Sequence, residues 1–221
     1  MMRNLLVAAV TFAVLLTVVA VASADHSWSV YHWPSDSLSP TVVDKTSSSL
    51  YDVPPGVAEW ANLGTPIQPI PTDANKGNIT VREAFSQSWL GLARIFIDGN
   101  GHITKGEVKL NTQYLDYYEA NGYPGIADHV LCQEIGHVLG LGHNRTDLDT
   151  CMNDQAFTGP GLTSPNAHDT DQLNLIYDGH SDTSADSTTD NGGPDCEKNS
   201  NAKQCRSGNG FWITVHVFPL P

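Results

Sequence analysis

The hydrophobic pattern of the chain predicts a body built from interleaved strands and helices. β-Branched and aliphatic residues are concentrated at 92–98 and 102–111, as is typical of strands, and further strands are expected after residue 25 and within 65–85. Apolar residues at helical spacing predict a short helix at 57–62 and a longer one at 126–139. Helices and strands that alternate in this way indicate an α/β or α+β fold.

The two ends of the chain follow different patterns. A basic start, an apolar run over 5–21 and the small residues Ala22, Ser23 and Ala24 predict a signal peptide at 1–24, so we expect a secreted, extracellular protein. Residues 179–209 are rich in Ser, Thr, Asp, Asn and Gly and predict a linker or exposed loop. Residues 210–221 alternate apolar positions like a strand. Residues 25–178 therefore form the expected main domain.

Charge and length narrow the classes of partner. The net charge of −13 disfavours nucleic acid and anionic membrane surfaces, which select basic patches. After the predicted cleavage no other stretch is apolar and long enough to cross a bilayer. The mature chain has the size of one domain, and we expect a monomer.

The four cysteines predict two disulfides in an exported protein, with three possible pairings. We favour Cys132–Cys151, which would join the predicted helix 126–139 to the segment before Met152, and Cys196–Cys205, which would close a loop near the C-terminus. A zinc-binding cysteine tetrad is the competing interpretation, but the chain has no C-x-x-C pair.

One segment carries most of the chemistry: Q-E-x-x-H-x-x-G-x-x-H, from Gln133 to His143. Residues four apart lie on one helix face, so Gln133 and His137 can face a single ion. Gly140 permits backbone angles that let the chain leave the helix and return His143 to the same place. Three protein ligands and an adjacent Glu134 as general base match a catalytic zinc site.

This segment resembles the zinc signature of the metzincin peptidases, with Gln133 in place of the first histidine. The chain resembles a secreted bacterial matrixin-like metzincin over most of its mature length, through "SWLGLARIFIDGNGHITKGEVKLN", the "CQE-x-G-H" helix, "CMN" and "SPNAHDTDQLNLIY". The resemblance implies an α+β catalytic domain with a twisted mixed sheet, an active-site helix, a methionine turn at Met152 and a closing helix. It also implies a specificity-pocket wall near Ala156 and Phe157.

Other histidines are weaker ligand candidates. His129 lies eight residues before His137, about 12 Å of helix rise, so both nitrogens cannot reach one zinc from the same helix. His102 precedes a predicted strand, and His168 lies where the resemblance implies capping residues. Gln133 itself offers a neutral carbonyl oxygen, a weaker donor than imidazole.

A second motif, "DGNGHITKGE", resembles part of an EF-hand calcium loop. Its first ligand position would be Phe96, which cannot bind calcium, and the preceding residues look like a strand. We therefore expect a turn between two strands, with weak calcium binding by Asp98 or Asn100 left open.

These observations predict a secreted zinc endopeptidase, with an extended peptide paired to the strand around residues 106–110. The alternative is a pseudo-peptidase, catalytically impaired by Gln133, that serves as an extracellular binding module. Retention of Glu134, which a binding scaffold does not need, favours the enzyme.

Overall fold

The computed structural model describes residues 26–28, 30–145, 149–153 and 162–178, together with the backbone of three strands near the C-terminus. The predicted signal peptide, Ala156, Phe157 and Cys196 lie outside these residues, as does the side chain of Cys205. In the part of the chain that is described, no helix is long and apolar enough to cross a membrane.

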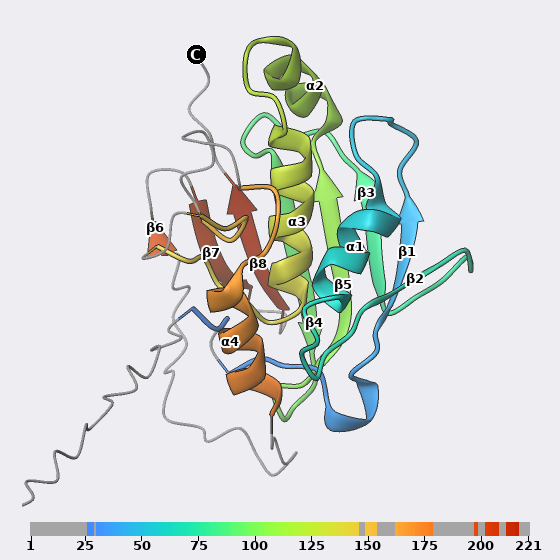
Figure 1. Cartoon of the computed structure of the whole chain (residues 1–221), viewed down its shortest axis with the longest axis vertical. Helices are drawn as coiled ribbons and strands as arrows, with labels where there is room; N and C mark the ends of the chain where they lie inside the picture. The colour runs from blue at the N-terminus through green and yellow to red at the C-terminus, as the bar shows by residue number, and fades with distance from the viewer. Residues whose placement is uncertain are drawn as a thin grey trace, which may run out of the picture.

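One mixed sheet forms the back of the molecule (Figure 1), with strand order β2-β1-β3-β5-β4-β8-β7-β6. Strands β1, β2, β3 and β5 run parallel, whereas β4 is antiparallel to both β5 and β8. The strands are β1 (Thr41–Lys45), β2 (Ile70–Thr72), β3 (Ile79–Glu83), β4 (Gly91–Ile97), β5 (Ile103–Leu110), β6 (Glu197–Lys198), β7 (Ala202–Ser207) and β8 (Phe211–His216). A mixed sheet combined with helices confirms the expected α+β class.

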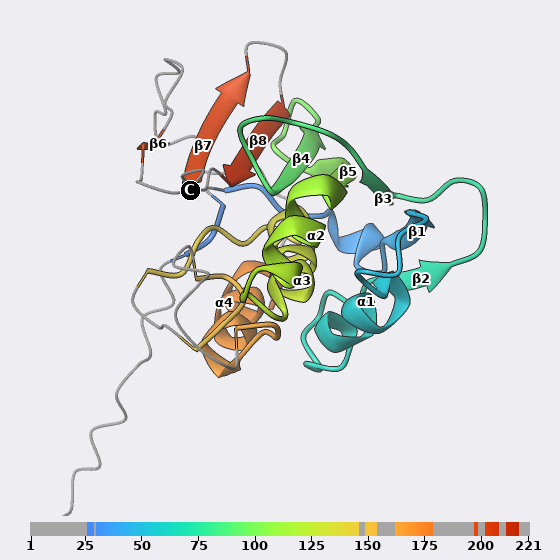
Figure 2. The same ribbon diagram turned by 90° about the horizontal axis from the view of Figure 1, so that it is seen from above.

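The helices cover one face of this sheet (Figure 2). They are α1 (Val53–Ala61), α2 (Thr112–Ala120), α3 (Ile126–Val138) and α4 (Ala167–Tyr177), preceded by the short 3-10 turn η1 (Ser35–Ser37). Helix α3 contacts β4, β5, α1 and α2, so it lies at the centre of the helical layer. Every residue of α3 except Asp128 is buried. The helix that carries Gln133, Glu134 and His137 of the motif therefore lies in the core.

Close packing around α3 explains one of its glycines. A Cβ atom at Gly136 would lie 2.3 Å from the Sδ atom of Met152 and 2.7 Å from Cζ2 of Trp60. Both side chains are fully buried, so neither has space into which it can move. Glycine at position 136, which lies between Glu134 and His137 in the sequence, thus lets Met152 lie directly against the helix.

The strands and helix predicted around the signature are confirmed. Strands β4 and β5 match 92–98 and 102–111 within one residue at each end, and α3 ends one residue before the predicted 126–139. The segment between β4 and β5 is a turn, in which the Asp98 carboxylate accepts hydrogen bonds from the backbone N–H groups of Asn100 and His102. The EF-hand interpretation is thus replaced by the expected strand–turn–strand.

Elsewhere the structure differs from the predicted elements. Helix α1 begins at Val53, ahead of the predicted 57–62, because Pro54 and Pro55 occupy its first turn, where a missing N–H costs nothing. Helix α2 was not predicted, since its tyrosines give little helical patterning. Strands β6 and β7 lie inside 179–209, where composition predicts a linker or exposed loop. They pair through backbone groups, which composition does not reveal.

Candidate metal centre and active site

Helix α3 and the turn after it bring His137 and His143 together. Gly140 has φ +104°, the left-handed conformation predicted for it, and it ends the helix so that the chain turns back. The Nε2 atoms of His137 and His143 lie 3.2 Å apart, with the rings perpendicular. Two adjacent ligands of a tetrahedral zinc, each about 2.05 Å from the metal, would lie about 3.3 Å apart. The two imidazoles therefore have the spacing of a zinc ligand pair.

The environment of His137 favours its role as a ligand. Its ring is fully buried, and Nδ1 donates to the carbonyl oxygen of Leu141 at 2.8 Å in the neutral tautomer, which leaves the lone pair on Nε2. Burial lowers the pKa of His137 to about 4, so the ring is neutral at neutral pH. Trp28 packs edge-on against this ring and fixes it further.

Gln133 is held at one end of its side-chain amide. Its Nε2 donates to the backbone carbonyl of Asn153 at 2.9 Å, in the segment just after Met152. Its Oε1 is buried and accepts no hydrogen bond from the described residues. A buried carbonyl oxygen without a donor is costly unless a cation or water satisfies it. The set of two imidazoles and one amide oxygen therefore fits a zinc ion, with Gln133 as the weakest donor.

Glu134 points towards the start of β4. Its carboxylate is fully buried, and a Cβ at Gly91 would lie 2.4 Å from Oε1. Burial raises the pKa of Glu134 well above its usual value, and the nearby backbone N–H of Ala93 opposes this only in part. Glu134 is therefore a group with high proton affinity, placed at the junction of α3 and β4.

The methionine turn is tied to α3 by a covalent bond and by packing. The expected Cys132–Cys151 disulfide is present, with the two Cα atoms 5.9 Å apart. Met152 is fully buried, and its carbonyl accepts a hydrogen bond from the N–H of Asn144, directly after His143. Gln133, His143 and Met152 thus belong to one rigid unit.

The expectation that a bound peptide pairs with the strand around residues 106–110 is wrong. This segment is the second half of β5, which pairs with β3 on one side and β4 on the other. All of its backbone pairing positions are therefore used within the sheet. The strand that contacts Glu134 is β4, which β5 and β8 pair on its two sides, so an extended peptide near this carboxylate would have to take the place of one of them.

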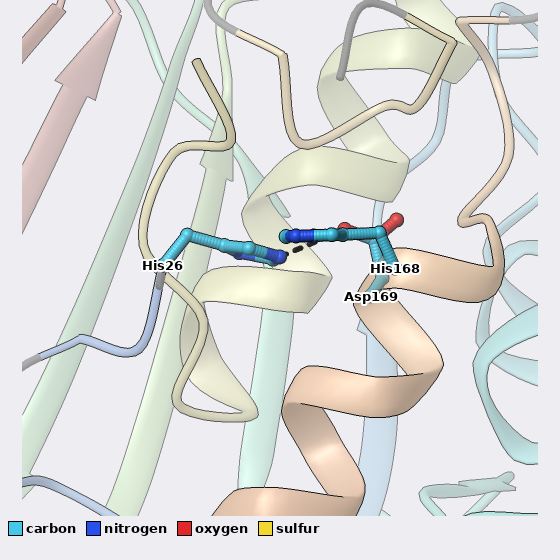
Figure 3. Close-up of side chains that lie close together, drawn as sticks. All are labelled: His26, His168 and Asp169. Carbon is cyan, nitrogen blue, oxygen red and sulfur yellow. Dashed lines mark ion pairs between the residues drawn. The ribbon is translucent and has the colours of Figure 1, made fainter. Parts of the chain in front are cut away.

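Three residues outside the signature form a second group of ligand-type side chains (Figure 3). The ligand atoms of His26, His168 and Asp169 all lie within 4.8 Å of one another. The two imidazole rings are stacked with an interplanar angle of 16°, whereas imidazoles that share an ion point their edges at it. Asn144 donates from Nδ2 to Nδ1 of His168 at 3.0 Å, and Asp169 forms the capping box of α4 with Asn166. These contacts indicate a structural anchor.

Sequence reasoning did not identify His26, because nothing local marks it. The backbone N–H of His26 donates to Oε1 of Gln172 at 2.9 Å, and its Nε2 lies 3.4 Å from Oδ1 of Asp169. The N–H of Trp28 donates to the carbonyl of Gly140 at 2.6 Å. The first described residues thus bind α4 and the turn that carries His143. Only long-range contacts place them there.

We predict that zinc binds to Gln133, His137 and His143. It should not bind to the group formed by His26, His168 and Asp169 (the His26 group). The His168→Ala variant should bind zinc as the unchanged protein does, whereas His137→Ala should lose it, because His168 is stacked and His137 faces His143. Metal analysis after dialysis against limiting zinc checks both variants. Loss of zinc in His168→Ala, with zinc kept in His137→Ala, would place the metal at the His26 group.

The remaining histidines have other contacts. The ring of His129 contacts the carbonyl of Leu162 through Nδ1, in agreement with its exclusion as a ligand. His102 lies 3.2 Å from Asp98 and packs edge-on against His32.

Burial of His129 predicts a loss of stability in acid. Burial lowers the pKa of His129 to about 4, against about 6.5 in an unfolded chain. Between pH 6.5 and 4 the unfolded chain therefore carries a proton on His129 that the folded protein lacks. Binding of this proton favours the unfolded state as the pH falls. The free energy of unfolding should fall by about 3 kcal/mol from this group as pH drops from 6.5 to 4. Urea unfolding at pH 7 and 4.5, with a chelator present, should show a smaller loss for His129→Gln. Equal losses would contradict the assignment.

Comparison with known proteins finds a weak likeness to a solved structure. No protein family model matches the chain, and no curated protein matches it. The chain is similar to a solved structure titled "Structure of myroilysin", with a TM-score of 0.45 and 12% sequence identity over 70% of this chain and 98% of that chain. A likeness this weak carries no argument about activity. The function has to be inferred from the site itself.

Proposed function

We propose that this protein is a secreted zinc-dependent endopeptidase in which Glu134 is the general base. The observation that supports this most directly is the 3.2 Å separation of the His137 and His143 Nε2 atoms, one helical turn from a buried glutamate. The metzincin-like signature supplies the same residues in the same order. The N-terminal apolar run and the Cys132–Cys151 disulfide support export from the cell.

His137, His143 and Gln133 would hold the ion. When bound, zinc supplies a Lewis acid that polarises the scissile carbonyl and lowers the pKa of the attacking water. The protein fixes the donors in advance: Leu141 orients His137, Asn153 orients Gln133, and the disulfide joins the helix to the turn below it. Such preorganisation means that few groups have to move when the metal binds.

Glu134 would perform both proton transfers. Its carboxylate accepts the proton of the attacking water and then donates it to the nitrogen of the leaving amine, so that the peptide bond is replaced by a carboxylate and an amine. A raised proton affinity suits both steps, because the same group must hold the proton between them. Packing against Gly91 holds the carboxylate at the start of β4, where the peptide backbone would pass.

The substrate would be an extended peptide that pairs with β4 in place of the neighbouring strand β8. Gly91 makes the close approach of strand and helix possible, because any side chain there would collide with Glu134 and Val130. The net charge of −13 disfavours nucleic acid as a partner. We expect a monomer, since hydrolysis of this kind needs no second copy.

A binding module is the second candidate, and the observation that favours it is the hydrogen bond from Gln133 to Asn153. This bond gives the amide a structural role that needs no metal. Under this alternative the β4 region would bind extended peptides without cleaving them.

The deciding experiment combines metal analysis with hydrolysis by the mature protein. We expect stoichiometric zinc at neutral pH and cleavage of casein and of a fluorogenic peptide library that stops on chelation and returns with added zinc. A saturating peptide concentration is needed, because the peptide has to displace β8, the strand that pairs with β4. Absence of zinc, or cleavage that a chelator does not change, would overturn the proposal.

A further inference from the structure

The strand beside Glu134 has a partner on its outer edge. Strand β8 pairs antiparallel with β4 over five positions, from Leu92–Val215 to Phe96–Phe211. Figure 1 and Figure 2 show β8 lying next to β4 and continuing the sheet, with β7 beyond it. Since β5 occupies the other side of β4, both edges of β4 are paired.

This arrangement covers the backbone groups that a peptide would need. An added strand binds through the unpaired N–H and C=O groups of an edge strand. Gly91, the first residue of β4, lies against Glu134, and its neighbour Leu92 pairs with Val215. The C-terminal part of β8 therefore lies along the portion of β4 that adjoins the proposed general base.

The sequence between the body and β8 is suited to a detachable segment. Residues 179–196 are mainly Ser, Thr, Asp, Asn and Gly, with few apolar residues to bury. Strand β8 itself is apolar along most of its length, and it pairs with β7 as well as β4. A long polar connection ahead of the β7–β8 pair allows these two strands to leave the sheet without unfolding the body.

We infer that β8 is an internal occupant of the strand-binding edge of β4 and inhibits access of extended peptides to the Glu134 site. This inference rests on the proposed function for its catalytic consequence, but the binding of a strand to β4 is independent of catalysis. Release of the C-terminal segment, by cleavage in the polar connection, would expose the edge of β4. The full chain would then be a low-activity form and the cleaved chain a high-activity form.

The test uses the full chain, folded intact and then cut. Residues 184–189 are replaced with the recognition sequence of a site-specific protease, and the purified protein is compared before and after cleavage and removal of the released segment. We expect kcat/KM for a fluorogenic peptide to rise at least about tenfold after cleavage, mainly through a lower KM. An unchanged kcat/KM in a protein that hydrolyses the peptide would overturn the inference.

A binding measurement separates this inference from the proposed function. A labelled peptide with the sequence of residues 208–218 is titrated into the Glu134→Gln protein, intact and cut, and followed by fluorescence anisotropy. We expect at least tenfold tighter binding to the cut protein. Equal affinity for both forms, or binding to neither, would overturn the inference even if the enzyme is active. Tighter binding without any hydrolysis would support the edge site and refute the peptidase.

Single substitutions provide a second route without cleavage. Ile213→Pro removes a backbone N–H from the middle of β8 and should weaken its pairing with Arg94 on β4 or with Cys205 on β7. We expect a higher kcat/KM in this variant. Ser184→Pro, in the polar connection, is the matched control and should leave kcat/KM unchanged. Equal values in the two variants would contradict the role of β8.

Discussion

Replacing Glu134 with glutamine should lower kcat/KM for peptide hydrolysis by about a hundredfold to ten-thousandfold while zinc stays bound. The substituted amide would keep the shape of the side chain but could not accept the proton of the attacking water. Zinc should be retained because Glu134 is not one of the proposed ligands. Initial rates with a fluorogenic peptide and metal analysis of the same sample check both parts.

The effect should be specific to this glutamate. Glu59→Gln, on the exposed side of α1, is the matched control and should leave the rate unchanged. The Glu134→Gln protein should also unfold at the same or a higher urea concentration, because it removes an ionisable group whose charged form is disfavoured by burial. Equal cleavage by Glu134→Gln and the unchanged protein would end the enzymatic interpretation.

Replacing Gln133 with histidine should tighten zinc binding by at least tenfold, which corresponds to about 1.4 kcal/mol. Imidazole is a better zinc ligand than a neutral amide oxygen, and position 133 lies on the same face of α3 as His137. The gain in affinity should be limited, because the substitution removes the hydrogen bond to Asn153 that orients the Gln133 side chain. Competition with a chromophoric chelator measures the dissociation constant.

A second histidine substitution tests whether position matters. Gln113→His, on the exposed surface of α2, adds an imidazole far from the signature and should not change zinc affinity. If Gln133→His gains no more than this control, residue 133 does not face the metal. That result would favour the binding module, because the protein would then offer only His137 and His143 from the signature.

The site was predictable where its residues are close in sequence. Helix α3 and the positive φ of Gly140 follow from spacing and residue type, and Cys132–Cys151 was the favoured one of three possible pairings. The position of Met152 followed from the family resemblance. Each of these depends on contacts within about twenty residues, for which helix geometry or a short loop leaves few alternatives.

The strand beside the site was not predictable in the same way. Residues 106–110 and Gly91–Ile97 are both strands by composition, and nothing in either segment tells which one lies beside Glu134. The structure assigns that place to β4 through Gly91, where only a glycine fits against Glu134 and Val130. The same holds for His26, whose partners Gln172 and Asp169 lie more than 140 residues away in sequence.

The amino-acid sequence by itself determined the local chemistry of this protein: a helix that presents Gln133, Glu134 and His137, and a glycine turn that returns His143. Tertiary structure alone decided which strand adjoins Glu134, that β8 pairs with that strand, and that the first described residues reach α4. The physical reason is that helical spacing fixes neighbours through short-range geometry. Strand pairing joins backbone groups that are the same in every residue, so partners are selected only by the packing of the whole fold.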